Sequence, residues 1–251
     1  MSSLISRKLA NVRARLVDRV LEFKPFIKTL SIGSCDLRFF YATSQAVDWY
    51  DPLGPHLHAE FEWLQQRIAG RVETIIDAGA YHGLYAMVMA RAAAPGSRVV
   101  AVDPVASNAA IMEANFAING LDIEIVQAAV SDADAPISFT RESCGRIVQS
   151  GGLAVAGRKL TSILPEATVA KIDIEGAEFS VLPQQIDAMP TVHTWIVEIH
   201  PDFGFDPAIV LDLFRARSFE LLVLNRQAAR VQPLASDAPW TERTSLIALG
   251  P

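Results

Sequence analysis

Cysteine is nearly absent from this 251-residue sequence, which contains only Cys35 and Cys144. Two cysteines exclude a disulfide-rich scaffold, and reduced thiols in a cytoplasmic protein are the expected state. The sequence also has no CxxC pair and no cysteine–histidine cluster with the spacing of a structural zinc site. Because no stretch of about 18 apolar residues occurs, we expect no transmembrane span.

Positive charge is in the minority, since 22 Lys and Arg residues face 28 Asp and Glu residues and the net charge is −6. A general nucleic-acid binder would need a basic surface, so no nucleic-acid partner is expected. The N-terminus departs from this balance, because several basic residues lie before position 20 among apolar residues at helical spacing. This pattern predicts an amphipathic helix that covers its own domain, a partner or an anionic membrane, and it does not resemble a secretory signal.

Apolar residues are abundant, at 51% of the chain, which is enough for a core that needs no disulfide. From residue 71 onward, apolar runs bounded by turn residues alternate with segments of helical spacing. Strands are predicted at 74–78, 98–103, 123–129, 169–174, 194–199, 220–224 and 245–249, and helices at 84–93, 107–118, 177–186 and 207–216. This alternation is typical of an α/β domain with a mostly parallel sheet and helices on both faces.

Residues 1–70 lack this alternation and are predicted to form an N-terminal extension to an α/β domain that covers residues 71–251. The extension is expected to contain a strand pair near 36–43 and a helix near 58–69. We expect it to act as a substrate mouth or cap for the domain.

Two other segments are expected to lie near a ligand site, and one further short strand is predicted. A short strand is predicted at 136–140, and the glycine-rich segment 143–157 is predicted to be a loop that can close over the site. Trp49 and Tyr50 either line a substrate mouth or pack the extension against the domain.

A glycine-rich turn follows the first predicted strand, in the sequence DAGAYHG at 77–83. Glycine lets a ligand approach the backbone closely, and the start of the next helix offers free N–H groups. The Gly-x-x-x-Gly spacing departs from the dinucleotide fingerprint, and the Asp77 carboxylate would repel a pyrophosphate. A ligand with a positive centre and no phosphate, such as S-adenosylmethionine, fits this turn better.

An acidic residue, Asp103, ends the second predicted strand and is followed by Pro104. A carboxylate at this position can accept hydrogen bonds from both hydroxyls of a ribose. Together with the glycine turn, Asp103 therefore predicts a nucleoside-containing ligand.

Further acidic residues gather at the ends of the next two predicted strands, in KIDIEGAE at 171–178 and in VEIH at 197–200. Strand periodicity predicts that Asp173 and Glu175 share one face of the fourth strand. Glu178 is either a solvated carboxylate at a helix start or a part of the site. The two segments are expected to meet at the mouth of one crevice.

His200 and Glu198 are predicted to share one face of the fifth strand. A histidine beside a carboxylate is a candidate general base, so we assign His200 to this role with Glu198 or Asp173 as its partner. Asp173, Glu198 and His200 could instead hold a divalent metal. The sequence leaves these two alternatives open.

These motifs together resemble the FkbM family of methyltransferases. The resemblance rests on IIDAGAYHGLYAMVMA (75–90), VVAVDP (99–104), KIDIEGAE and VEIH, and it covers about residues 47–225. It implies a Rossmann-like class I methyltransferase fold with a seven-stranded, mostly parallel sheet. It also implies S-adenosylmethionine as the methyl donor and a hydroxyl group of a sugar-containing or polyketide-type metabolite as the acceptor.

The resemblance also implies which residues contact the cofactor. They are Asp77, Gly79, Ala80, Tyr81 and Gly83 for the methionine part, Asp103 and Pro104 for the ribose, Ala128 and Ala129 for the adenine, and Asp173. The family's usual acidic residue on the adenine side is absent, so backbone groups, Ser131 or Asp132 would make that contact. The family commonly has glutamate where Asp103 stands.

Two other functions suit the same fold. A nicotinamide-dependent dehydrogenase would use Asp103, but the glycine spacing and Asp77 count against it. A non-catalytic scaffold that binds the cofactor would not need the acidic residues at the ends of the fourth and fifth strands. Neither the acceptor nor the oligomeric state follows from the sequence.

Overall fold

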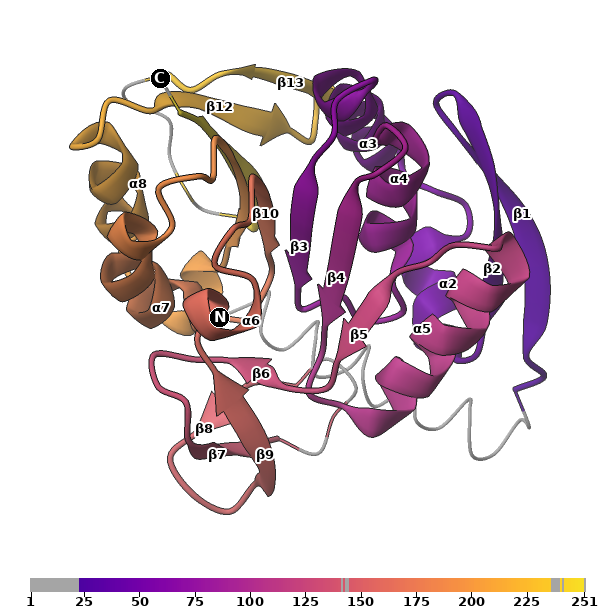
Figure 1. Ribbon diagram of the computed structural model, residues 1–251, viewed down its shortest axis with the longest axis horizontal. Helices are drawn as coiled ribbons and strands as arrows, with labels where there is room; N and C mark the ends of the chain where they lie inside the picture. The colour runs from indigo at the N-terminus through magenta and orange to yellow at the C-terminus, as the bar shows by residue number, and fades with distance from the viewer. Residues whose placement is uncertain (1–22, 141, 143–144, 236–239, 241, 251) are drawn as a thin grey trace.

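An eight-stranded sheet forms the centre of the protein in the computed structural model, which describes residues 23–140, 142, 145–235, 240 and 242–250 (Figure 1). In spatial order its strands are β13 (Arg230–Pro233), β12 (Glu220–Asn225), β14 (Thr244–Leu249), β11 (Thr194–Ile199), β10 (Val169–Ile172), β3 (Thr74–Ala78), β4 (Arg98–Val102) and β5 (Glu124–Val126). Strands β11 to β5 are parallel, and β14, β12 and β13 pair antiparallel. The predicted α/β fold with a mostly parallel sheet is confirmed, with β13 added at one edge.

The inner parallel strands read as apolar runs because both of their faces are covered. All four residues of β10 and the last four of β3 are buried, including Lys171 and Asp77. The bounds of β3 and β11 agree with the sequence prediction, while the predicted strand at 123–129 is divided into β5 and β6 (Ala129–Val130).

Helices cover both faces of the sheet, as expected (Figure 1). One face carries α3 (Pro55–Ile68), α4 (Leu84–Ala92) and α5 (Ala106–Asn119), and the other carries α6 (Leu160–Ile163), α7 (Glu178–Gln185), α8 (Ala208–Arg215) and the short 3-10 turn η1 (Ile186–Ala188). A second 3-10 turn, η2 (Pro201–Phe203), follows β11. Each face has its own hydrophobic core cluster. Among the described residues, no helix has the length and apolar character needed to cross a bilayer.

The described part of the N-terminal extension packs over α4 and α5 (Figure 1). It consists of the hairpin β1 (Phe26–Ile32) and β2 (Cys35–Tyr41), the helix α2 (Ser44–Tyr50) and α3. Side chains of the hairpin, such as Leu37 and Phe39, belong to the same core cluster as α4. The predicted basic helix at the N-terminus lies outside the described residues. The division of domains at residue 70 stays a prediction.

A second, four-stranded sheet follows β5, in the order β6, β9 (Leu153–Arg158), β7 (Pro136–Phe139) and β8 (Ile147–Val148). The short strand expected at 136–140 is therefore present as β7. The prediction of a loop throughout 143–157 is wrong, because β8 and β9 are strands; residues 143–144 lie outside the described residues. The glycines were interpreted as a sign of a loop, but at Gly152 the opposite holds. A Cβ at this position would collide with the backbone of Phe139, so glycine is what allows the two chains to pair here.

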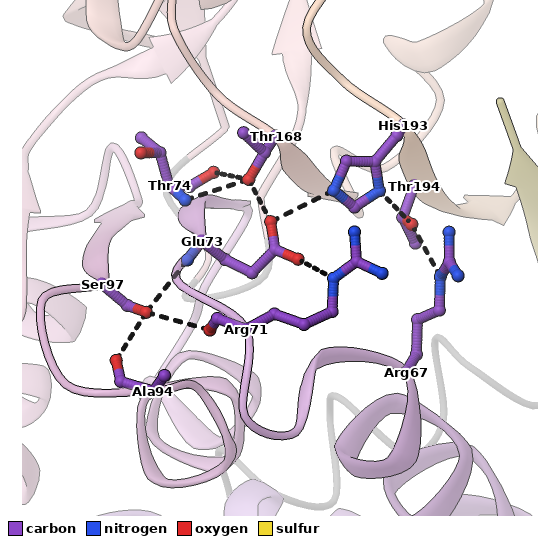
Figure 2. Close-up of polar contacts among 9 residues, drawn as sticks. All are labelled: Arg67, Arg71, Glu73, Thr74, Ala94, Ser97, Thr168, His193 and Thr194. Carbon is purple, nitrogen blue, oxygen red and sulfur yellow. Dashed lines mark hydrogen bonds and ion pairs between the residues drawn. The ribbon is translucent and has the colours of Figure 1, made fainter.

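A polar network connects the parallel strands at the edge where they begin (Figure 2). Glu73, directly before β3, is buried and accepts hydrogen bonds from Thr168 Oγ1 at 2.5 Å and Arg71 Nε at 2.9 Å. His193 Nε2 lies 3.1 Å from the same carboxylate. Thr168 and His193 directly precede β10 and β11, so Glu73 connects the starts of three strands. Burial opposes ionisation of Glu73, but Thr168, His193 and Arg71 together lower its pKa.

Replacing Glu73 with glutamine is expected to lower the free energy of unfolding by about 1–3 kcal/mol, because these hydrogen bonds lose a buried charged acceptor. The pKa of Glu73 is lower in the fold than in the unfolded chain. Its ionised form therefore stabilises the fold at neutral pH, and this contribution is lost as the pH falls through the folded pKa. Urea unfolding between about pH 7 and about pH 3 should show a smaller acid loss of stability in the variant than in the wild type.

The matched control is Glu166→Gln, because Glu166 is exposed and pairs with Arg98 at the surface, where an ion pair contributes little. Equal effects of the two substitutions at every pH would contradict this account of the network.

Candidate active site

The first cleft opens at the carboxyl ends of β3, β4 and β10, where the strand order reverses between β3 and β10. Open α/β sheets bind their ligands at such a switch point. The cleft has a volume of about 800 Å³. Its lining includes all but one of the predicted cofactor contacts: Asp77, Gly79, Ala80, Tyr81, Asp103, Pro104, Ala128, Ala129 and Asp173.

Gly83, the remaining predicted contact, does not line the cleft but shapes its wall. It has φ +82 and begins α4, and a Cβ there would collide with the ring of Phe116. Gly79 has φ +83, and its N–H and that of Ala80 both donate to Val102 O. A Cβ at Gly79 would collide with the carbonyl oxygen of Asp173, so glycine lets the turn lie directly against the chain that follows β10.

Asp77 presents a buried negative group to this cleft. Its side chain is buried, and Oδ2 has no hydrogen-bond partner. Burial raises the pKa of Asp77 to about 6, opposed by the charge of Lys171 and reinforced by that of Asp173. A buried carboxylate oxygen without a partner favours a ligand with a positive centre. S-adenosylmethionine, with its ammonium and sulfonium groups, fits this observation.

Asp103 is held in a fixed orientation at the end of β4. Its Oδ2 accepts from Tyr81 N at 3.1 Å, and its Oδ1 accepts from Val105 N at 2.9 Å and Asn108 Nδ2 at 3.1 Å. Burial raises the pKa of Asp103 to about 7, although these three donors oppose the shift. The carboxylate borders the cleft at the position expected for a ribose.

The side of the cleft at which adenine binding was predicted is apolar, and part of its lining was not predicted. Ala128 and Ala129 line the cleft, whereas Ser131 Oγ donates to Ala133 O and is not among the lining residues. Asp132 is not among them either. Phe139 and Ile147, from β7 and β8, complete the wall. Phe139 was not predicted to contact a ligand, whereas Ile147 belongs to the segment 143–157 that was predicted to close over the site as a loop.

A second cleft, of about 1080 Å³, adjoins the first on the side of the N-terminal extension. The two share the residues Trp49, Tyr50, Tyr85, Asp173 and Glu175. The second cleft is also lined by Asp48, His56, Leu57, Glu60, Glu198, Leu224, Arg226, Arg243 and Ser245. Trp49 additionally packs on Tyr81, with ring centroids 4.9 Å apart. Trp49 therefore packs the extension against the domain, as one of the two alternatives predicted, and it also lines both clefts.

Asp173 lies where the two clefts meet. Strand β10 ends at Ile172, so Asp173 and Glu175 lie in the loop after it. The prediction that they share one face of the strand is therefore wrong. Glu175 has φ +52. The turn at Gly176, with φ +97, ends the strand earlier than the apolar pattern indicates. The side chain of Asp173 is 28% exposed, in contrast to the buried groups around it.

Two neighbouring groups hold the Asp173 carboxylate. Lys171, buried in β10, places Nζ 3.5 Å from Asp173 Oδ2 and 4.8 Å from the centroid of the Tyr85 ring. Glu198, near the end of β11, hydrogen-bonds to Asp173. Burial, which raises the pKa of Asp173, is outweighed by Lys171, His200 and this hydrogen bond, and the pKa is lowered. Burial and Asp173 raise the pKa of Glu198. A lysine within an apolar strand was a sequence signal for this buried charge.

His200 lies behind Asp173, directly after β11, and is completely buried. Its Nδ1 lies 2.8 Å from Oε1 of Glu178, which is also completely buried. Nε2 has no hydrogen-bond partner and faces Asp173 Oδ1 at 3.5 Å and Glu175 Oε2 at 3.7 Å. Burial lowers the pKa of His200, but Glu178, Glu198 and Asp173 raise it to about 10. Glu178 is therefore part of the site and not a solvated helix-start residue.

A family model described as "Methyltransferase FkbM domain" matches residues 77–221. No protein of curated function matches the sequence.

Three solved methyltransferase structures are similar to this chain at low sequence identity. The FkbM methyltransferase of Methylobacillus flagellatus KT is 18% identical with a TM-score of 0.45, over 70% of this chain and 43% of that one. A T. thermophilus 16S rRNA methyltransferase in complex with AdoMet and guanosine is 13% identical with a TM-score of 0.53, over 90% and 51%. A SAM-dependent methyltransferase of Agrobacterium tumefaciens is 15% identical with a TM-score of 0.50, over 88% and 69%. This chain thus spans about half the length of the first two, and the latter two likenesses indicate a shared fold.

Proposed function

This chain belongs to the FkbM family of S-adenosylmethionine-dependent methyltransferases, and we propose that it methylates a hydroxyl oxygen of a small polar metabolite. Membership of this family favours methyl transfer over the two alternatives, a nicotinamide-dependent dehydrogenase and a non-catalytic scaffold. The observation that carries the proposal is the common wall of the two clefts, because it brings a cofactor site and an acceptor site together at Asp173.

The first cleft is the proposed cofactor site. Asp77 would attract the positive methionine end, Asp103 would accept from the ribose, and the apolar wall of β7 and β8 would enclose the adenine. When bound there, S-adenosylmethionine would supply a methyl group from its sulfonium: the acceptor oxygen would bond to the methyl carbon as the carbon–sulfur electron pair leaves with sulfur, and the hydroxyl proton would pass to the protein. The protein's part is to hold the reacting atoms in line, which can supply much of the rate.

Asp173 is the proposed group that contacts the acceptor and takes its hydroxyl proton. It is partly exposed and borders both clefts, whereas His200, the base predicted from the sequence, is enclosed behind it. We therefore place His200 and Glu198 as positioning residues that orient the Asp173 carboxylate. This arrangement keeps the predicted trio of His200, Glu198 and Asp173 and gives its members different roles.

The N-terminal extension is the proposed wall of the acceptor site. Asp48, Trp49, Tyr50, His56, Leu57 and Glu60 line the second cleft from this part of the chain. His56 Nε2 lies 3.1 Å from Arg226 Nη2, which connects the extension to the C-terminal part of the domain. The mixture of aromatic, basic and acidic groups suits a metabolite with several hydroxyl groups, such as a sugar-containing or polyketide-type molecule. The net charge of −6 does not favour a nucleic-acid acceptor.

Calorimetric titration of the full chain with S-adenosylmethionine and, separately, NAD tests the cofactor site. We expect binding of the methionine nucleoside alone, weakened by about 10-fold to 100-fold in Asp103→Ala, because a charged acceptor is lost. Glu166→Gln, at the surface, should bind as the wild type does. Preference for NAD would overturn the assignment of the cleft.

A panel of hydroxylated, amino and nucleic-acid acceptors, supplied with methyl-labelled S-adenosylmethionine, tests the acceptor class. The expected product carries the label as a methyl ether. Labelled amines or nucleic acids with unlabelled alcohols would contradict the proposal.

A further inference from the structure

Asp173, Glu175 and His200 form a compact group at the wall between the two clefts. One ligand atom from each lies within 4.8 Å of the other two. His200 Nε2 lies 3.5 Å from Asp173 Oδ1 and 3.7 Å from Glu175 Oε2, which is within ion-pair distance, and it makes no hydrogen bond. Neighbouring ligand atoms around a divalent ion at about 2.1 Å are themselves about 3.0–3.4 Å apart. Small side-chain shifts would therefore give all three atoms a coordinating distance.

The orientation of His200 is the second observation that points to a cation. The ring is completely buried, and its Nε2 is directed at the two carboxylates without a hydrogen bond. Its other nitrogen lies 2.8 Å from the buried Glu178 carboxylate. Histidines that bind metals usually donate their second N–H to a carboxylate, which fixes the tautomer and orients the free nitrogen toward the ion. Glu178 stands in that position.

The charges around the group also leave room for a positive ion. Four carboxyl groups lie close to His200, those of Asp173, Glu175, Glu178 and Glu198, and Lys171 and Arg243 pair with two of them. An ion bound at Nε2 would replace the proton that these carboxylates favour there. Arg243 Nη1 donates to Glu175 Oε2 at 2.9 Å and Nη2 pairs with Asp202. A carboxylate has enough lone pairs to accept from this guanidinium and bind an ion at the same time.

We propose that Asp173, Glu175 and His200 bind one divalent transition-metal ion, with Glu178 as the residue that orients His200. Two carboxylates and one imidazole suit Mn²⁺, Fe²⁺ or Zn²⁺ better than Ca²⁺ or Mg²⁺, which prefer oxygen ligands. Asp173 and Glu175 border both clefts, so the ion has an entry path and open coordination positions facing the acceptor. Its role rests on the proposed function: the ion would bind the acceptor hydroxyl oxygen and make its proton easier to remove.

The test measures metal binding to the full chain without cofactor or acceptor, after treatment with a chelator. Mn²⁺ is titrated and followed by loss of the free-ion electron paramagnetic resonance signal, and Zn²⁺ is titrated by calorimetry. We expect one Mn²⁺ per chain, displaced by Zn²⁺ and not by an equal concentration of Mg²⁺. Glu175→Gln and His200→Gln should weaken binding at least 10-fold, and Glu178→Gln about 10-fold to 100-fold.

The control variant is Glu166→Gln, an exposed carboxylate remote from the site, which should bind Mn²⁺ as the wild type does. Circular dichroism verifies the fold of each variant. Glu175 lies in a partly exposed loop, so its variant keeps the test decisive if His200→Gln does not fold. Absence of Mn²⁺ and Zn²⁺ binding, or binding that Glu175→Gln leaves unchanged, would overturn the site. Methylation of alcohols by a chain that binds no metal refutes the site alone, and metal binding without alcohol methylation refutes the proposed function alone.

Discussion

Asp173→Asn is expected to lower kcat for methyl transfer by about a hundredfold to ten-thousandfold, the usual range for loss of a group that accepts a proton in the transition state. Asparagine has nearly the same shape as aspartate but cannot take the proton of the acceptor hydroxyl. Because Asp173 also borders the cofactor cleft, a smaller loss of S-adenosylmethionine affinity should accompany the loss of kcat. The measurement is steady-state kinetics with an acceptor identified from the panel, together with cofactor titration of the same variant.

Glu198→Gln is the matched control for this substitution. Glu198 hydrogen-bonds to Asp173, and a glutamine amide can still donate to that carboxylate. We expect kcat to fall less than about 10-fold in this variant, since the proton acceptor is retained. A kcat that is unchanged in Asp173→Asn, or lowered equally in both variants, would place the base elsewhere.

Gly79→Ala is expected to abolish measurable binding of S-adenosylmethionine and to lower the melting temperature. The residue has φ +83, a conformation that costs an alanine about 1–2 kcal/mol. Its Cβ would also collide with the carbonyl oxygen of Asp173. The turn or the loop after β10 must then move, and both carry walls of the cofactor cleft. Calorimetry and thermal unfolding of the purified variant measure the two effects.

Gly96→Ala separates the collision from the conformational cost. Gly96 has φ +94, but a Cβ there would meet no atom within 4 Å. This variant should lose about 1–2 kcal/mol of stability and bind the cofactor as the wild type does. Similar cofactor affinities in the two alanine variants would show that close approach of Gly79 to Asp173 is not needed.

The elements that could be predicted from the sequence are those whose signal is local. β3 and β11 are apolar runs with polar or turn residues at both ends, and their bounds agree with the prediction. The segment 153–158 was missed because its strand character depends on pairing with β7, a partner that composition does not reveal. The end of β10 was placed two residues late, since the turn at Glu175 and Gly176 interrupts an acidic segment that otherwise alternates like a strand.

By itself the sequence determined the parallel sheet, the glycine turn beside Asp77 and the acidic residue at Asp103, because apolar periodicity and turn chemistry act over a few neighbouring residues. The tertiary structure alone decided which carboxylates surround His200. Glu178 lies 22 residues before it in the chain and contacts it at 2.8 Å, whereas Glu198, two residues away, interacts with Asp173. Such contacts depend on how α7 packs beside β11 and where β10 ends, and this is set by the burial of whole elements and not by the spacing of residues along the chain.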